Sequence, residues 1–461
     1  MSLPLLQLRE KHPRFLYHGY RILHESEALR FSFDFELEPD IRFSPEVVIE
    51  GLSQQRILRL GQAILNNIAF HLGLIEIPSY WKVACSPQII VRAGTLDEYQ
   101  LTWWKHLLIN GQGEFFFTNN IDFTQPDFVR FATEAKDTPT VHPYQDQLDN
   151  KVLVPIGGGK DSAVTCELLR ENGKDLTCWC LNPTPATLDI MRVSQISESI
   201  VIRRRIDQNL LKLNAKGYLN GHTPFSAYLA FLSTACAILF NIKSIAVSNE
   251  RSSNEGNAFF KGVEINHQYS KSFDFERRFR DYSARYLAES SDYFSFLRPL
   301  YELQIAKIFS RFPQYFSVFR SCNKGQKTNS WCHKCAKCLF AFTILYPFLQ
   351  EEKLVKHIFS ENLFEKEDLA EVALDLLGEG IAKPFECVGS VEETMVAFYM
   401  CIKEVKQRNT SLPIVLRVVE EKIFAHQSHM EERMFSIINS WNNYHAIPKD
   451  FEELLEKEAN L

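Results

Sequence analysis

Three glycines followed by Lys160, Asp161 and Ser162 stand between an apolar run and a helical pattern, at residues 157–162. Glycine lets the backbone approach a phosphate closely and adopt positive φ angles. The start of a helix adds unpaired N–H groups and the positive end of a dipole. Lys160 adds a charge that can oppose the negative charge of a transition state. The segment predicts a phosphate-binding loop, and the alternative is an ordinary tight turn between a strand and a helix.

A second group of reactive side chains consists of four cysteines with the spacing Cys-x9-Cys-x2-Cys-x2-Cys: Cys322, Cys332, Cys335 and Cys338. Four thiolates at this spacing suit tetrahedral Zn²⁺. An iron–sulfur cluster is an alternative, as is a set of thiols without a metal. Because four protein ligands leave no open position for a substrate, the site is expected to be structural.

Side chains suited to acid/base chemistry gather in residues 262–276, where His267 and Lys271 are four positions apart. This segment could hold a substrate and transfer protons. A surface loop that leads into a helix would have a similar composition, so both interpretations stay open. His222 stands just before the apolar segment at residues 225–240 and could face a nucleotide or cap that segment.

The elements around these residues alternate between short apolar runs and amphipathic segments. Strands are expected at residues 151–156, 176–181, 199–203 and 243–248, and helices at 160–171 and 225–240. Strands separated by helices imply parallel pairing with right-handed crossovers, which is a doubly wound sheet. Such sheets bind ligands at the carboxyl ends of their strands, where the glycine segment is expected to lie.

The whole chain reads as three blocks. Residues 1–148 form an α+β block with strands near 28–37 and 88–92 and helices near 52–72 and 96–110, and residues 138–150 are a plausible linker. Residues 149–340 form the α/β block, and residues 341–461 are expected to be mostly helical. At 461 residues, two or three domains are expected.

Composition narrows the class of protein. The net charge of −6 disfavours nucleic acid as a partner, because nucleic-acid binding usually needs a basic face. The first residues lack the pattern of a signal peptide, and the apolar stretch at residues 227–240 is shorter than the roughly 20 residues that span a bilayer. We therefore expect a soluble, cytoplasmic protein that does not bind a membrane. The sequence does not indicate its oligomeric state.

The glycine segment resembles the pyrophosphate loop of the N-type ATP pyrophosphatases, written Ser-Gly-Gly-x-Asp-Ser. The positions that match this pattern are Gly158, Gly159, Asp161 and Ser162, whereas Gly157 stands where the pattern has serine. The P-loop and dinucleotide-binding patterns do not fit these residues. The resemblance implies that the loop holds the β- and γ-phosphates of ATP and that Asp161 helps to organise Mg²⁺.

The same resemblance implies that loops after the second and fourth strands surround adenine, ribose and the α-phosphate. In this chain the residues in those loops are Asn182, Asn249, Glu250 and Arg251. The planar guanidinium of Arg251 suits bidentate contact with the α-phosphate or with an acyl phosphate. The alternative is a solvated polar turn.

The wider arrangement resembles the UDP-N-acetylmuramoyl-L-alanyl-L-glutamate epimerases (MurL). The resemblance rests on a front block before GGGKDS, then NGHTPFSA, SNERSSNEGN and INHQYSKSFDFE, then the cysteines and a helical tail with KPFECVG. It implies an ATP pyrophosphatase-like core and an isomerase that makes D-glutamate for peptidoglycan, in cell wall biogenesis, cell shape and cell division. It also implies ATP and Mg²⁺ as cofactors, a nucleotide-sugar dipeptide as substrate, and a front block that holds the UDP-sugar.

The chemistry that this family implies begins with adenylation of the glutamate α-carboxylate, which releases pyrophosphate. The mixed anhydride makes the Cα proton acidic enough for a side-chain base, and reprotonation from the other face inverts the centre. Hydrolysis then releases AMP. His267 and Lys271 are the candidate bases, and Cys387 beside Glu386 is a further candidate whose alternative is a buried thiol.

Two other functions remain possible at this stage. A nucleobase- or tRNA-modifying ATP pyrophosphatase would share the loop, and a cysteine group also follows the core in the 7-cyano-7-deazaguanine synthases. A non-catalytic nucleotide-binding protein is the other possibility, because the loop lacks a serine at Gly157.

Overall fold

The computed structural model describes residues 4–135, 141–380 and 382–459. The chain forms two compact units, each assembled from separate stretches of sequence. Unit 1 comprises Met1–Leu153, Ile200–Ile245 and Phe259–Tyr293, and unit 2 comprises Val154–Ser199, Ala246–Ala258 and Phe294–Leu461. The three-block boundaries remain a prediction. The proposed linker at 138–150 falls partly outside the described residues, and its last two positions already belong to a strand.

Unit 1 contains a mixed sheet built from the front of the chain. Its first strands are β1 (Arg14–His24), β2 (Ala28–Leu37), β3 (Ile41–Phe43), β4 (Glu46–Glu50), β5 (Gln88–Val91) and β6 (Arg130–Thr133). In β2, alternate side chains are fully buried, namely Leu29, Phe31, Phe33, Phe35 and Leu37. This period of two places one apolar face against the core. β2 pairs antiparallel with β1, β3 and β4, whereas β5 pairs parallel with β1 and β6.

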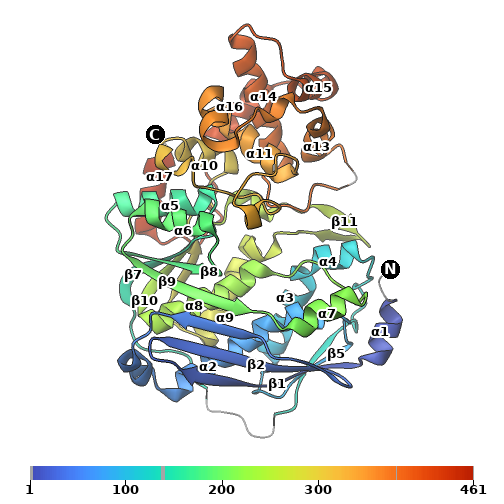
Figure 1. Ribbon diagram of the computed structural model, residues 1–461, viewed down its shortest axis with the longest axis vertical. Coiled ribbons are helices and arrows are strands. Elements are labelled where there is room, and N and C mark those ends of the chain that lie inside the picture. The colour runs from blue at the N-terminus through green and yellow to red at the C-terminus, as the bar shows by residue number, and fades with distance from the viewer. Residues whose placement is uncertain (1–3, 136–140, 381, 460–461) are drawn as a thin grey trace. The chain divides into compact units, whose positions relative to one another are not determined.

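The helices of unit 1 are α1 (Leu5–Lys11), α2 (Gln54–Trp81), α3 (Glu98–Gly111), α4 (Gly113–Thr118), α7 (Gln208–Ala215), α8 (Phe225–Phe240) and α9 (Phe273–Tyr286). The long helix α2 packs against β1 and α8 (Figure 1). By length and composition α2 could cross a membrane, but 72% of its most apolar window is buried in the structure. That burial is typical of a core helix.

The four strands predicted in the second block are confirmed as β7 (Asp149–Pro155), β8 (Leu176–Leu181), β9 (Glu198–Arg205) and β10 (Ile242–Val247). β10 pairs parallel with β7, as predicted. β9 lies between β8 and β4 in the sheet and pairs antiparallel with β4, a strand of the front block, so the sheet as a whole is mixed rather than wholly parallel. The alternation in β9 of buried Ile200 and Ile202 with exposed arginine is typical of an antiparallel strand with one solvated face. The structure is therefore α/β with a mixed sheet.

Most helices of unit 2 lie after residue 294 in the sequence. Its helices are α5 (Lys160–Glu171), α6 (Pro185–Ser194), α10 (Glu302–Phe309), α11 (Ala336–Leu345), α12 (Glu351–Leu354), α13 (Ala370–Leu376), α14 (Val391–Gln407), α15 (Ile414–Lys422), α16 (Met430–Ile438) and α17 (Lys449–Ala459). Figure 1 shows α11 and α13 to α16 gathered together, and they contact one another. The helical C-terminal region is confirmed for the described residues. The remaining short strands are β11 (Ala258–Phe260), β12 (Val263–Ile265) and β13 (Asp292–Ser295).

Candidate active site and metal centre

The loop between β7 and α5 has the backbone geometry of a glycine-dependent turn. Gly158 has φ +91°, and a Cβ atom there would lie 3.2 Å from the Cβ of Ala186. Gly159 precedes α5, and no side chain among the described residues caps that helix. A Cβ atom at Gly157 would have no other described atom within 4 Å, so a serine would fit there. The N–H groups at the start of α5 are therefore available to an anion.

The lysine and aspartate of this loop form a buried charged cluster with Glu302, the first residue of α10. The Lys160 ammonium donates to the carboxylates of Asp161 and Glu302. The side chains of Lys160 and Glu302 are each only 7% exposed. Burial lowers the pKa of Lys160, but the two carboxylates more than offset this, so its pKa is raised and it stays protonated. Burial and the nearby Asp161 raise the pKa of Glu302, against the opposing effect of Lys160.

The loop after β10 lies next to this cluster in unit 2. Ser248 donates to Thr165 of α5 at 2.8 Å. Asn249 donates its side-chain amide to Ser295 at 3.0 Å, and Glu250 is 3% exposed and contributes to raising the pKa of Glu302. The loops after β7 and β10 therefore lie together in this unit.

Two other residues expected near a nucleotide have different surroundings. Arg251 donates to Ser440 Oγ at 2.6 Å, and its guanidinium lies 4.3 Å from the centroid of the Tyr301 ring. The guanidinium is therefore already held by a hydroxyl and an aromatic face. Asn182 follows β8, is exposed and has φ +45°.

A different cluster lies within unit 1, where two imidazoles approach one carboxylate. His267 forms a hydrogen bond through Nδ1 with Glu114 of α4, and His222 Nδ1 lies 3.2 Å from the same Glu114 oxygen. The two rings are 4.5 Å apart between centroids. Burial lowers the pKa of His222 to about 4, and the neighbouring His267 adds to this shift. His222 is therefore neutral near pH 7. The sequence had indicated His267 but not Glu114.

Lys271, the other candidate base, lies in the short 3₁₀ turn Tyr269–Lys271 just before α9. Its ammonium donates to the side-chain oxygen of Gln268 at 3.0 Å.

Glu386 contacts the start of α11. Its carboxylate accepts a hydrogen bond from the backbone N–H of Lys337 at 2.8 Å. A carboxylate in the first turn of a helix satisfies an unpaired donor and interacts favourably with the helix dipole. This contact gives Glu386 a structural role, and its catalytic role stays a prediction. Cys387 is half-buried.

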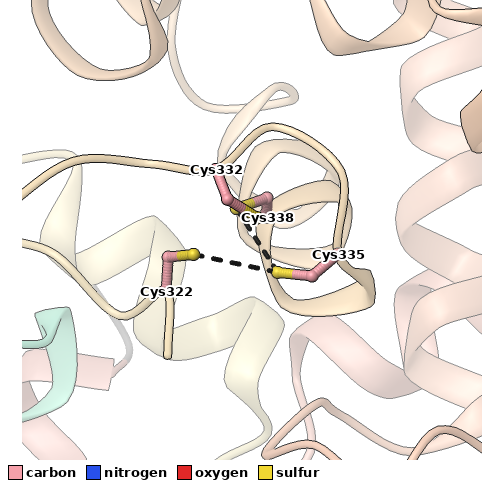
Figure 2. Close-up of side chains that lie close together, drawn as sticks. All are labelled: Cys322, Cys332, Cys335 and Cys338. Carbon is pink, nitrogen blue, oxygen red and sulfur yellow. Dashed lines mark hydrogen bonds between the residues drawn. The ribbon is translucent and has the colours of Figure 1, made fainter. Parts of the chain in front are cut away.

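The four predicted metal ligands come together in unit 2 (Figure 2). All four sulfur atoms lie within 4.8 Å of one another. Sγ of Cys335 is 3.5 Å from that of Cys338 and 3.9 Å from that of Cys322, and Cys332 lies 3.7 Å from Cys338. Four sulfurs at about 2.3 Å from one tetrahedral ion would be about 3.8 Å apart. The spacing therefore fits a single ion.

The surroundings of the cysteines also suit a metal centre. The N–H of Gly325 donates to Cys322 Sγ at 3.2 Å, and a Cβ at Gly325 would collide with the carbonyl of Ser330. Such an N–H···S contact orients a ligand sulfur and offsets its charge. His333, which lies next to Cys332 in the sequence, contacts the Glu361 carboxylate through Nδ1 at 2.8 Å.

Family models match most of the chain. The model described as MurL N-terminal domain covers residues 7–296, and the one described as MurL C-terminal domain covers residues 318–433. No solved structure matches the chain.

Three curated proteins are similar to this chain, and each is named UDP-N-acetyl-alpha-D-muramoyl-L-alanyl-L-glutamate epimerase. The protein from a Micromonospora species is 33% identical over 428 residues, which cover 91% of this chain and 92% of the relative. The Salinispora tropica protein is 32% identical and covers 78% of each chain. The Xanthomonas oryzae pv. oryzae protein is 33% identical over 71% of this chain and 72% of its own length.

Proposed function

Because the chain belongs to the MurL family, we propose that it is an epimerase that converts the terminal L-glutamate of UDP-N-acetylmuramoyl-L-alanyl-L-glutamate to D-glutamate. The observation that carries this proposal is the match to a relative of that name over 91% of the chain. The product would serve peptidoglycan precursor synthesis. Since that substrate is a nucleotide-linked small molecule, we place the reaction in the cytoplasm, without a membrane or nucleic-acid partner.

We further propose that ATP activates the substrate. A free α-carboxylate resists loss of the Cα proton because the product would carry a second adjacent negative charge. Attack of the carboxylate oxygen on the α-phosphate of ATP forms an adenylate and expels pyrophosphate. The Gly157–Gly158–Gly159 turn and the start of α5 are suited to hold the pyrophosphate portion. This arrangement supports an ATP pyrophosphatase-like core.

Mg²⁺ is the proposed partner of the phosphates, and the oxygen ligands it prefers are present in the charged cluster. Asp161 and Glu302 are carboxylates beside the glycine turn, and Lys160 lies between them. Bound Mg²⁺ would neutralise negative charge on the phosphates. Ser162, whose hydroxyl donates to the Gly159 carbonyl at 3.1 Å, stabilises the first turn of α5.

The nucleoside portion would be held by Asn182 and by Asn249, Glu250 and Arg251. The position of Asn249 and Glu250 next to the Lys160 cluster supports this assignment. Arg251 would exchange its contact with Ser440 for a phosphate oxygen.

Proton transfer at Cα is assigned to His267, with Lys271 or Cys387 as the second group. The contact between His267 and Glu114 supports His267, because a carboxylate that orients an imidazole is a common arrangement in acid/base catalysis. The four cysteines would hold a structural Zn²⁺, since their sulfur spacing fits one tetrahedral ion and leaves no open ligand position. The front of the chain would hold the UDP-sugar.

The test is to incubate the purified protein with ATP, Mg²⁺ and the muramoyl dipeptide, and to quantify AMP, pyrophosphate and D-glutamate. The proposal requires AMP and pyrophosphate in equal amounts and D-glutamate that forms only with ATP. Formation of AMP with a nucleobase or tRNA substrate instead would favour a nucleic-acid-modifying enzyme. Binding of ATP without cleavage would favour a non-catalytic nucleotide-binding protein.

A further inference from the structure

The cluster of Glu114, His222 and His267 contains a residue with no assigned role. An ionised carboxylate only accepts hydrogen bonds, so the Nδ1 atom of His267 that bonds Glu114 must carry the proton. The same bond then places the basic lone pair of the ring on Nε2. Glu114 thus selects the tautomer and the orientation of His267.

We propose that Glu114 is the positioning residue that makes His267 the proton-transfer base of the epimerisation. This inference rests on the proposed function, which it deepens by naming the group that supports the base. Glu114 lies in α4 and His267 is 153 positions further along the chain, so only the fold brings the two side chains together.

The step balances in protons and electrons. The Nε2 lone pair of His267 takes the Cα proton of the glutamyl adenylate, and the C–H electron pair enters the enolate. The imidazolium that forms keeps its Nδ1–H on the Glu114 carboxylate, whose charge stabilises it. A proton delivered to the opposite face by the second group completes the inversion. His267 then gives its new proton to water, and the second group takes a proton from water, so both groups return to their starting states.

The other groups around the cluster favour this role over metal binding. Two imidazoles and a carboxylate could also hold a divalent ion. Lys82, however, donates to the carbonyl of Gly221, next to His222, and its charge contributes to lowering the pKa of His222. A resident ammonium opposes a divalent cation at this position. His222 is neutral, so the carboxylate is left to stabilise the charge that develops on His267.

The experiment separates adenylation from proton transfer in the full-length protein with ATP, Mg²⁺ and the muramoyl dipeptide. Exchange of radiolabelled pyrophosphate into ATP measures adenylation, and deuterium entering glutamyl Cα from heavy water measures proton transfer. The isosteric variant Glu114→Gln should keep the pyrophosphate exchange within about twofold and lose about 10²-fold or more of the deuterium incorporation. Glu114→Asp, which restores the charge, should recover at least tenfold of that loss.

Two further variants complete the design. His267→Gln should show the same split between the two reactions, and Glu134→Gln, at a carboxylate that is 47% exposed, should change neither. Equal loss of both reactions in Glu114→Gln, or no loss in either, would overturn the inference. So would a second transition-metal ion per chain, measured by elemental analysis, that disappears in Glu114→Gln. If the unmodified protein catalyses neither reaction, the proposed function itself fails.

Discussion

Replacing Lys160 with methionine removes the ammonium that lies between the carboxylates of Asp161 and Glu302. Methionine has a similar length, so the change removes charge rather than packing. Because Glu302 is only 7% exposed, the variant leaves a buried carboxylate without its cation. Removing one partner of a buried ion pair costs about 3–5 kcal/mol, and this is the upper limit of the loss of unfolding free energy that we expect at pH 8.

The loss should depend on pH with a defined sign. Burial and Asp161 raise the folded-state pKa of Glu302 above its ordinary value of 4.5, and the variant lacks the lysine that opposes this shift. A carboxyl group with a raised folded-state pKa opposes folding increasingly as pH rises from its unfolded pKa to its folded pKa. In the unmodified protein the pKa of Glu302 is already raised to about 8, so the deficit of Lys160→Met should be small near pH 5, where the carboxyl is protonated in both proteins, and should grow as the pH rises through 8.

Urea unfolding of the full chain at both pH values, followed by circular dichroism, measures the deficit. The double variant Lys160→Met/Glu302→Gln removes both charges and should regain most of the stability at pH 8, because the unpaired carboxylate is gone. Both variants should lose ATP cleavage, because neither keeps the Lys160 ammonium beside the glycine turn. A deficit that is equal at pH 5 and pH 8, or that persists in the double variant, would refute the reasoning.

Three further changes give distinct outcomes. Gly158→Ala should destabilise the fold by about 1–2 kcal/mol and weaken ATP binding measured by calorimetry, because φ is +91° and the new Cβ would crowd Ala186. The control Gly157→Ser, whose side chain would point into open space, should change neither stability nor ATP binding. Cys335→Ser should abolish stoichiometric zinc in elemental analysis and lower the melting temperature, whereas Cys387→Ser should retain the metal; equal zinc in both variants would contradict the assigned ligand set. Glu386→Gln should lower the free energy of unfolding by about 0.3–1 kcal/mol, because the charge at the start of α11 is lost, and it should keep epimerase activity. Loss of activity at unchanged stability would instead show that Glu386 is catalytic.

The parts that the sequence predicted are those whose signal is local. The glycine turn and α5 are contiguous, and α5 runs from Lys160 to Glu171 as predicted. The four cysteines are also close in sequence, so their spacing alone indicated a common centre. In β2, α8 and β8 the apolar pattern of each segment matched its burial in the fold.

The side-chain contacts and the strand pairing that the sequence did not predict join residues that are distant in sequence. Glu302 joins Lys160 across 142 positions and stands at the start of a short helix without a motif of its own. Glu114 joins His267 in the same way, from a helix of six residues. The antiparallel pairing of β9 with β4 was not predicted, because pairing between distant strands is not encoded in either strand alone.

The measurement that tests the central claim most directly is incubation with the muramoyl dipeptide in heavy water, with and without ATP and Mg²⁺. Activation of the carboxylate by ATP predicts that deuterium enters the glutamyl Cα only when both are present. Deuterium that enters at the same rate without ATP would contradict the claim that adenylation precedes proton transfer.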